Sequence, residues 1–348
     1  MLRARSLATA ALALALVVPV TACDGRAGGA PEEAALRGAS TTPGATATPA
    51  PDQHVLAISV DGLNTEAITQ LGATGAPTLH RLLAEGAGTL NARTEFEQTV
   101  TLPNHTSMMT SRRIDAARDG HGVTWDDDRR GTTVQRAAGH PVASIFSVVH
   151  ADGGSTALYS TKTKFGLYER SWPAGIDSYT VRENQRKLVA LARADLLDGA
   201  ATFTFLHVSL PDRTGHEFGG MSSRYVAAVQ KTDKQLGTLV RALAGGDVTV
   251  ILTADHGFAT GKTDHSARRD IENYRIPFVA WGAGVDPGDL YAMNPGFRDP
   301  GTKRPSYAGK QPVRNGDVAN LAAMLLGLGA VPGSGIDADQ SLAVSESH

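Results

Sequence analysis

The chain has 348 residues, among them 33 Lys and Arg and 35 Asp and Glu, and its formal charge is −2 at pH 7. A charge so close to zero gives no electrostatic basis for a structural nucleic-acid partner. Cys23 is the only cysteine, so no disulfide can form within the chain and no cysteine is available to build a metal site in the domain that follows.

Residues 1–22 have the pattern of an export signal. Arg3 and Arg5 precede an apolar stretch, 7–20, which is too short to span a bilayer comfortably, and small residues lead to Cys23. This order resembles a bacterial lipoprotein signal; the alternative is an ordinary signal peptide with an incidental cysteine. We expect lipidation of Cys23 and a protein anchored to the cell membrane on its extracytoplasmic side.

The composition divides the remaining chain into three parts. Residues 23–53 are rich in Ala, Gly, Thr and Pro and carry few large apolar residues, so we expect a disordered tether. Residues 54–340 have the length of one large α/β domain. Residues 341–348 are expected to fray.

Short apolar runs alternate with helical patterns along the domain. Strands are predicted at 54–60, 142–149, 155–159, 202–209, 247–253 and 276–281, and helices at 77–85, 180–197, 222–244 and 318–327, the last with Asp317 as N-cap. The near-continuous apolar strands are typical of a sheet that is covered on both faces. We therefore expect an α/β fold with a mostly parallel central sheet and helices on both faces.

Carboxylates and imidazoles follow three of these strands. Asp61, Asp212 and Asp255 each come just after an apolar run, and His216, His256 and His265 accompany them. Taken singly, each has an ordinary explanation as a turn or surface residue. In a parallel sheet the ends of these strands lie at one edge, where ligands bind, so the set could hold two metal ions.

Thr101 opens the segment Thr-Leu-Pro-Asn-His, 101–105, before an apparent helix. Free N–H groups and the helix dipole at such a position favour anions. A threonine hydroxyl needs activation to act as a nucleophile, which nearby metal ions would supply. An N-capping threonine is the alternative interpretation.

Six motifs, in this order, resemble the type I phosphodiesterase/nucleotide pyrophosphatase family of the alkaline phosphatase superfamily. They are Val-Asp-Gly (60–62), Pro-Thr-Leu-His-Arg-Leu-Leu-Ala-Glu-Gly (77–86), Thr-Leu-Pro-Asn-His (101–105), Asp-Arg-Thr-Gly-His (212–216), Ala-Asp-His-Gly (254–257), and His265 before Asn-Tyr-Arg-Ile-Pro-Phe (273–278). The resemblance covers about 54–340.

The resemblance implies an alkaline-phosphatase-like fold and two divalent ions, usually Zn²⁺. Asp61, Thr101, Asp255 and His256 would hold one ion, and Asp212, His216 and His265 the other. It implies attack by Thr101 on phosphorus, a phospho-threonine intermediate, and hydrolysis of phosphodiester or nucleotide pyrophosphate bonds in small molecules. Ligands without thiolate suit zinc but leave manganese or iron open.

One position departs from the family pattern. Aligning His121-Gly122-Val123-Thr124-Trp125 places Asp126 where many members have Asn, and an ionised carboxylate there would repel a phosphoryl oxygen. Either the loop is shifted, or Asp126 turns away or carries a proton, or the substrate differs. Lys162, Lys164 and Arg112 are further candidates for phosphate contact, with solvated loop side chains as the alternative. Trp125, Phe165 and Tyr168 are candidates for the wall of an apolar group such as a nucleobase, with ordinary packing as the alternative.

Two other functions fit the same residues. A phosphomonoesterase or phosphonate hydrolase would use the same metals, because specificity lies in loops. A non-catalytic surface-binding lipoprotein would retain only the fold. The oligomeric state has no signal in the sequence.

Overall fold

A computed structural model describes residues 53–346. Eight strands of this region form one sheet, in the order β4-β3-β5-β1-β6-β7-β2-β8. The strands are β1 (His54–Val60), β2 (Ala87–Arg93), β3 (Thr156–Ser160), β4 (Ser178–Val181), β5 (Phe203–Val208), β6 (Val248–Thr253), β7 (Arg275–Gly282) and β8 (Gly288–Asp289). Only β7 runs against its neighbours, so the sheet is mostly parallel, as the apolar strand pattern predicts.

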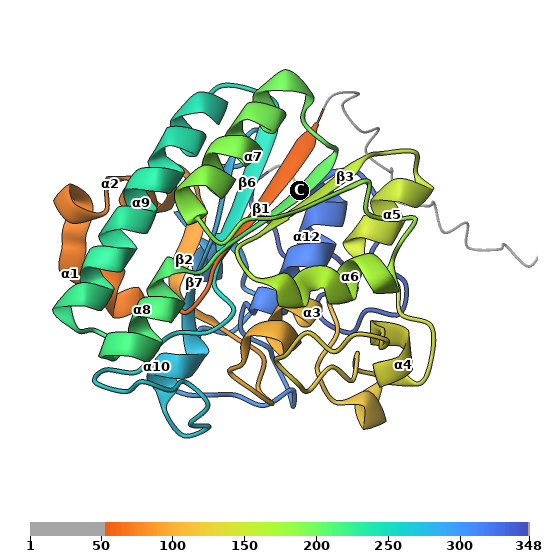
Figure 1. Cartoon of the computed structure of the whole chain (residues 1–348), viewed down its shortest axis with the longest axis horizontal. Coiled ribbons are helices and arrows are strands. Elements are labelled where there is room, and N and C mark those ends of the chain that lie inside the picture. The colour runs from red at the N-terminus through yellow and green to blue at the C-terminus, as the bar shows by residue number, and fades with distance from the viewer. Residues whose placement is uncertain (1–52, 347–348) are drawn as a thin grey trace, which may run out of the picture. The chain divides into compact units, whose positions relative to one another are not determined.

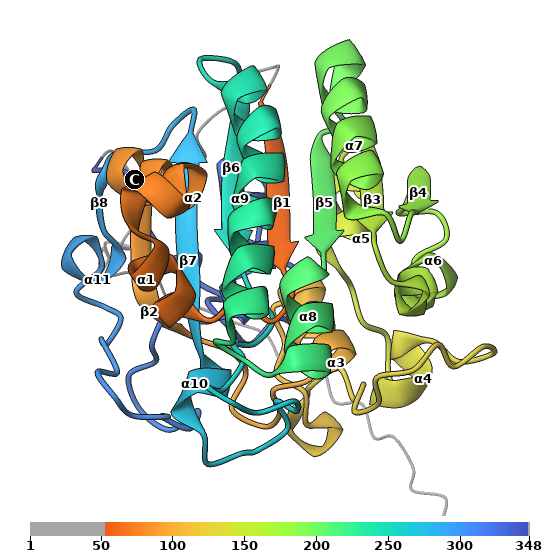
Figure 2. The same cartoon turned by 60° about the vertical axis from the view of Figure 1, so that its left-hand side comes forward.

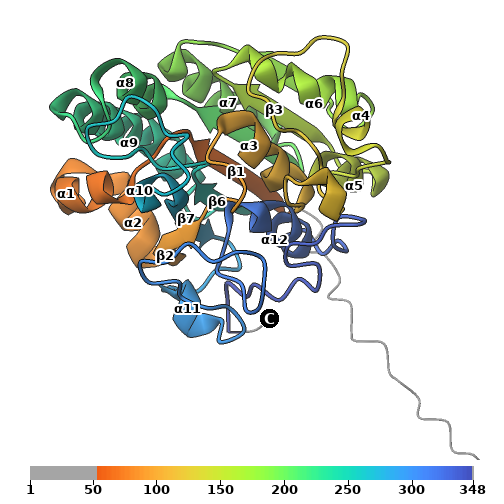
Figure 3. The ribbon, with the colours of Figure 1, turned by 90° about the horizontal axis from the view of Figure 1, so that it is seen from below.

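Helices cover both faces of the sheet (Figure 1). One face carries α1 (Thr65–Gly75), α2 (Pro77–Glu85), α7 (Gln185–Gly199), α8 (Leu210–Phe218) and α9 (Ser223–Leu243). The other face carries α3 (Thr101–Thr110), α5 (Ile145–Ala151) and α12 (Val318–Leu325), and the two groups lie on opposite sides of the strands in Figure 3. The remaining helices are short: α4 (Val134–Ala138), α6 (Gly166–Ser171), α10 (Ile271–Tyr274), α11 (Leu290–Met293), and the 3₁₀ turns 116–118, 163–165 and 315–317.

The core lies between the sheet and these two helix layers. All six residues from Val55 to Val60 are buried, as are those of β5 and β6, because both faces of the central strands are covered. The longest helix, α9, begins after the N-cap Ser222 and buries a stripe that includes Val229, Leu236 and Val240. No helix in the described part of the chain has the length and apolarity that crossing a bilayer would require.

Three sequence predictions are wrong in detail. Residues 142–149 do not form a strand: Ser144 and Ser147 cap each other's backbone N–H groups and start α5 there. The helix predicted from 180 begins at Gln185, after strand β4. Asp317 gives no side-chain cap to α12, because its carboxylate accepts the Arg314 N–H instead.

The expected frayed tail is also ordered as far as the structure describes it. Leu342 and Val344 are buried, and Asn294 exchanges hydrogen bonds with Ala343. The predicted signal peptide, Cys23 and all but the last residue of the predicted tether lie outside the described residues.

Candidate active site

Three adjacent strands deliver the candidate carboxylates to one place. Strands β5, β1 and β6 are parallel neighbours, and their carboxyl ends point toward the loops around α3, α8 and α10 (Figure 2). Asp61 directly follows β1, Asp255 follows β6 by two residues, and Asp212 lies in the first turn of α8 after β5. All three are at most 1% exposed, and the predicted convergence of the strand ends is therefore observed.

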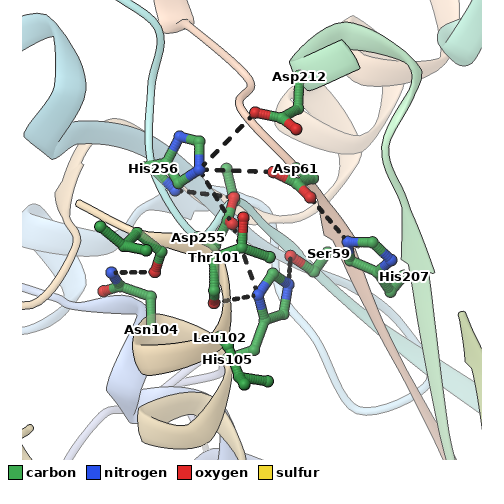
Figure 4. A network of polar contacts seen from close by, with 12 residues as sticks. Ser59, Asp61, Thr101, Leu102, Asn104, His105, His207, Asp212, Asp255 and His256 are labelled. Atoms are coloured by element: carbon green, nitrogen blue, oxygen red, sulfur yellow. Dashed lines mark hydrogen bonds and ion pairs between the residues drawn. The ribbon is translucent and has the colours of Figure 1, made fainter. Parts of the chain in front are cut away.

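The first candidate metal group consists of Asp61, Asp255 and His256 (Figure 4). His256 Nε2 lies 3.5 Å from Asp61 Oδ1 and 3.3 Å from Asp255 Oδ2. A tetrahedral zinc ion has ligand atoms about 2.0–2.2 Å away, which places those atoms roughly 3.3–3.6 Å from one another. The three side chains therefore stand at the spacing of a single small ion.

The second candidate group consists of Asp212, His216 and His265. Asp212 Oδ1 lies 3.3 Å from His216 Nε2 and 3.5 Å from His265 Nε2, and the two Nε2 atoms are 3.2 Å apart. His256 is also near this group, but its Nε2 is 4.0 Å from Asp212 Oδ1, so His216 is the better third member. The ring of His265 stacks on that of His256, with centroids 3.6 Å apart.

Unpartnered buried atoms mark the same two groups. Asp61 Oδ1, Asp255 Oδ2, His256 Nε2 and Asp212 Oδ1 have no hydrogen-bond partner among the described residues. Buried polar atoms are usually satisfied, so four unpartnered acceptor atoms in the same two groups indicate residues suited to hold a cation.

The imidazoles have the tautomer that metal binding needs. Nδ1 of each ring lies within hydrogen-bond distance of a backbone carbonyl oxygen: His256 to Gly257 at 2.8 Å, His216 to Thr263 at 2.8 Å and His265 to Thr99 at 2.6 Å. A carbonyl only accepts, so Nδ1 carries the proton and Nε2 presents its lone pair to the site. Burial lowers the pKa of His256, and burial together with His256 lowers the pKa of His265 to about 3, which keeps both rings neutral.

The second oxygen of each carboxylate is held by the protein. Asp61 Oδ2 lies 2.9 Å from His207 Nε2 and 2.6 Å from Lys162 Nζ. Lys162 Nζ also donates to Asp212 Oδ2 at 2.8 Å, and Asp255 Oδ1 accepts the N–H groups of Gly62 and His256. Such contacts orient ligands and leave one oxygen of each free for an ion.

The charges around Lys162 show how the metal-free cluster is balanced. Burial lowers the pKa of Lys162, but Asp61 and Asp212 outweigh it and the net pKa lies above its usual value. For Asp255, burial and the neighbouring Asp61 raise the pKa well above its usual range. One ammonium is therefore insufficient for three buried carboxylates, and further positive charge would stabilise the cluster.

Thr101 is the first residue of α3 and is buried. Val100, not Thr101, is the N-cap residue, and no side chain of the N-cap bonds the helix, so the capping interpretation of Thr101 does not hold. Its Oγ1 lies 3.5 Å from Lys162 Nζ. The hydroxyl thus shares an ammonium with one carboxylate from each metal group.

Asp126 lies at the N-terminus of α3, where it contacts the first turn. Its Oδ1 accepts the Leu102 N–H at 2.9 Å, and its Oδ2 pairs with Lys164 Nζ at 2.7 Å. Trp125 is partly buried, with the Arg129 guanidinium 4.9 Å over its ring. The loop that carries Asp126 is therefore not shifted away from Thr101, and Lys164 forms an ion pair with the Asp126 carboxylate.

Three of the predicted substrate contacts are wrong. Phe165 and Tyr168 are fully buried core residues and cannot form a wall against a substrate. Arg112 lies beyond the opposite end of α3 from Thr101, and its guanidinium donates to the carbonyl oxygens of Asp119 and Pro332.

Two buried histidines were missed as parts of the site. His207 supports Asp61, and its position within a strand that leads to Asp212 was the available signal. His105 lies in the quoted motif 101–105; its Nδ1 lies 2.7 Å from the Thr101 carbonyl oxygen and 3.5 Å from Asp255 Oδ2. It therefore links the first turn of α3 to a candidate ligand.

The segments that carry Asp61 and Asp212 are joined by a backbone hydrogen bond. The Asp212 N–H donates to the Asp61 carbonyl oxygen at 3.2 Å. Gly62, with φ +70°, lies so close that a Cβ there would stand 3.0 Å from Asp212 Cα. A glycine is therefore required where these segments meet.

The chain belongs to the type I phosphodiesterase/nucleotide pyrophosphatase family. The family model matches residues 55–123 and 118–307, which together form most of the described domain and include every candidate ligand.

Curated relatives match a shorter part of the chain. GPI ethanolamine phosphate transferase 1 of Chaetomium globosum is 33% identical over 133 residues, covering 35% of this chain and 14% of that protein. Phosphopentomutase of Shewanella loihica is 36% identical over 95 residues, covering 27% of this chain and 22% of that enzyme. The chain thus spans less than a quarter of these relatives.

Solved structures share the fold over most of the domain. Murine ectonucleotide pyrophosphatase/phosphodiesterase 5, in complex with AMP, has a TM-score of 0.58 and 16% identity, covering 84% of this chain and all of that one. The lipoteichoic acid synthase LtaP of Listeria monocytogenes has a TM-score of 0.55 and 16% identity, covering 84% and 76%. A protein of the alkaline phosphatase superfamily from Vibrio parahaemolyticus has a TM-score of 0.56 and 17% identity, covering 84% and 71%, and these likenesses together confirm the alkaline-phosphatase-like α/β fold.

Proposed function

We propose that this protein hydrolyses phosphodiester or nucleotide pyrophosphate bonds, with Thr101 as nucleophile and two divalent ions as cofactors. The observation that carries the proposal is the set of unpartnered buried carboxylate and imidazole atoms, linked to Thr101 through Lys162, which contacts Asp61, Asp212 and the Thr101 hydroxyl. Family membership supports phosphate-ester chemistry, and the AMP bound by the murine relative supports a nucleotide as the substrate.

Asp61, Asp255 and His256 would hold one ion beside Thr101, and Asp212, His216 and His265 the other. When bound, the ions supply Lewis acidity, which favours the ionised form of a nearby hydroxyl and neutralises charge on phosphoryl oxygens. The donor set of carboxylates and neutral imidazoles suits zinc.

The chain's own groups carry the reaction. Thr101 Oγ1 attacks phosphorus, the new O–P bond forms and the bond to the leaving oxygen breaks, and the hydroxyl proton leaves with that oxygen as an alcohol or, for a pyrophosphate bond, a phosphate. The product is a phospho-threonine that keeps the other ester arm. Water then attacks the phosphorus, releases the product and restores the threonine hydroxyl. Lys162 lies 3.5 Å from Oγ1, where its charge favours the alkoxide and can hold a non-bridging oxygen.

Asp126 favours a diester over a monoester. A phosphate diester carries one negative charge at neutral pH, whereas a monoester carries close to two. Lys164 pairs with Oδ2 of Asp126, but Oδ1 accepts the Leu102 N–H next to the nucleophile, so this oxygen repels a dianion more strongly than a monoanion.

The proposal is tested with the full chain, purified and loaded with zinc. Turnover of bis-aryl phosphodiesters, nucleoside 5′-aryl esters and aryl phosphomonoesters is compared in wild type, Thr101→Ala and Thr101→Ser. We expect turnover of the diesters to fall by at least about a thousandfold in Thr101→Ala and to persist in part in Thr101→Ser. Wild-type protein with two bound ions and no turnover of any ester would exclude the function, and full activity in Thr101→Ala would exclude the mechanism.

We also propose that the mature protein is tethered outside the cytoplasm through lipid on Cys23. The support is the sequence of residues 1–23 alone. Mass spectrometry of the membrane-extracted protein would show an N-terminal Cys23 carrying acyl groups. A Cys23→Ser variant that stays in the membrane fraction would refute the anchor.

A further inference from the structure

A concave site is formed by chain segments that continue into the candidate active site. It has a volume of about 320 Å³, which is enough for one arm of a small ester. Its wall includes the side chains of Phe96, Gln98, Arg113, Thr124, Arg268 and Arg304. None of these residues belongs to the metal groups or to the contacts of Thr101.

Three chain segments lead from the active site directly into this pocket. Gln98 precedes Thr99, whose carbonyl oxygen lies 2.6 Å from His265 Nδ1. Thr124 comes two residues before Asp126, and Arg268 three residues after His265. Since a residue spans at most about 3.6 Å, the backbone of Thr124 is at most roughly 7 Å from that of Asp126. The backbone of Arg268 is at most roughly 11 Å from that of His265. The pocket is therefore within reach of one substituent on the reacting phosphorus.

The charges in the pocket favour an anion. Arg113 is paired with Glu97, Nε to Oε1 at 2.7 Å, so this pair adds little net charge. Within residues 53–346, Arg268 makes no side-chain hydrogen bond or ion pair, and Arg304 has no carboxylate partner. The remaining carboxylate on the wall, Asp115, accepts the Ala117 N–H. The wall thus carries three arginines and two carboxylates, Glu97 and Asp115, which leaves one positive charge in excess.

Arg304 is also held in place for recognition. Its guanidinium lies 4.4 Å from the Phe96 ring centroid and 4.5 Å from that of Tyr274, and it donates to the Tyr274 hydroxyl at 2.7 Å. A guanidinium fixed between two rings loses little freedom when it binds a ligand, and its fork matches a carboxylate or phosphate. Phe96 adds an aromatic surface for the part of the ligand next to the charge.

We propose that this pocket binds an anionic group, a carboxylate or a second phosphate, on one arm of the substrate. The inference rests on the proposed function and names its substrate class: phosphodiesters that carry a further negative charge on an ester arm. Arg268 and Arg304 would bind the charge, and Phe96 the arm.

The test uses a symmetric substrate pair, so that the orientation of the ester does not matter. The zinc-loaded full chain is given bis(4-carboxyphenyl) phosphate or bis(4-carbamoylphenyl) phosphate, which differ in charge and little in size. We expect the carboxylated diester to have a roughly tenfold higher kcat/KM, through a lower KM. Arg268→Gln should bring the ratio close to one, while Arg269→Gln, an exposed neighbour outside the pocket wall, should leave it unchanged. A phosphonate in place of each carboxylate shows which anion is preferred.

Binding to Thr101→Ala, measured by calorimetry with the same pair, separates this inference from the proposed function. Turnover of both diesters at equal KM, with equal binding, would overturn the pocket and leave the function standing. Absence of turnover together with tighter binding of the carboxylated diester, lost in Arg268→Gln, would overturn the function and leave the pocket standing. A ratio that falls equally in Arg268→Gln and Arg269→Gln would show only a general field effect and would refute the site.

Discussion

Asp126 Oδ1 accepts the backbone N–H of Leu102, the residue that follows the candidate nucleophile. Free N–H groups at the start of a helix are a natural site for a phosphoryl oxygen, so a protein carboxylate now occupies that position. A substrate must displace it or bind beside it. The side chain of Asp126 is 38% exposed, which leaves it room to turn outward.

Replacing Asp126 by Asn should raise activity. The amide keeps an acceptor for Leu102 but removes the negative charge, so we expect kcat/KM for a bis-aryl phosphodiester to rise by about threefold or more. The gain should be larger for a phosphomonoester. Asp127→Asn, which changes an exposed carboxylate paired with Arg129, is the matched control in the same steady-state assay. A fall in kcat/KM for Asp126→Asn would mean that the carboxylate assists the reaction.

Metal stoichiometry should follow the two ligand groups. We expect two ions per chain by mass spectrometry of the zinc-loaded protein, and one in His216→Ala, since that change removes a ligand from one group only. His150→Ala, a surface histidine far from both groups in sequence, should retain two. Chelation should abolish turnover of a phosphodiester, and added zinc should restore it. Two tightly bound ions in His216→Ala would refute the assignment of that residue.

Lys162→Met should separate catalysis from metal binding. Because the ammonium lies beside Thr101 Oγ1, its loss should lower kcat by about a hundredfold to a thousandfold. The proposed ions would neutralise Asp61 and Asp212, so the metal content should stay at two. Lys187→Met, in the exposed first turn of α7, gives the comparison for loss of a lysine charge. An unchanged kcat would exclude Lys162 from the reaction.

Glu95 should make the fold less stable as pH rises. Burial raises its pKa from 4.5 to about 7, although Arg314 opposes the shift. Between these values the folded chain holds a proton that the unfolded chain has released. Stability is therefore lost as pH rises through this window, by up to roughly 3 kcal/mol.

Glu95→Gln should remove the part of the pH dependence of the unfolding free energy that comes from this carboxyl group. Denaturant unfolding at pH 5 and pH 8, with zinc constant, should show a smaller loss of stability in the variant than in wild type. Glu183→Gln, an exposed substitution, controls for net charge. Identical slopes for Glu95→Gln and wild type would show that Glu95 is ionised throughout.

Strand order explains why the convergence of the three candidate carboxylates could be predicted from the sequence. Asp61, Asp212 and Asp255 follow buried strands, and parallel strands bring their ends together whatever the helices do. The apolar run 142–149 could not be assigned in the same way, because a short apolar run is compatible with a strand or a buried helix. Ser144 decides the outcome through a local capping interaction.

The supporting contacts were harder to predict because they join distant segments. His207 bonds Asp61 across 146 positions, and Lys162 approaches Asp212 only through the packing of β3 against β5. Arg112 shows the opposite error: it lies eleven positions from Thr101, but the helix between them places it at the far end. The sequence shows that a residue is charged, but the site that its side chain reaches depends on the path of the backbone.

The hydrogen bond from Asp212 N–H to the Asp61 carbonyl, with Gly62 packed against Asp212, ties one residue from each ligand group to the same piece of backbone. For the two ions that we propose, the distance between their positions would then be set by the polypeptide. Exchanging zinc for manganese or iron would change the acidity and the rate of the proposed reaction, while the distance between the two ion positions would stay the same.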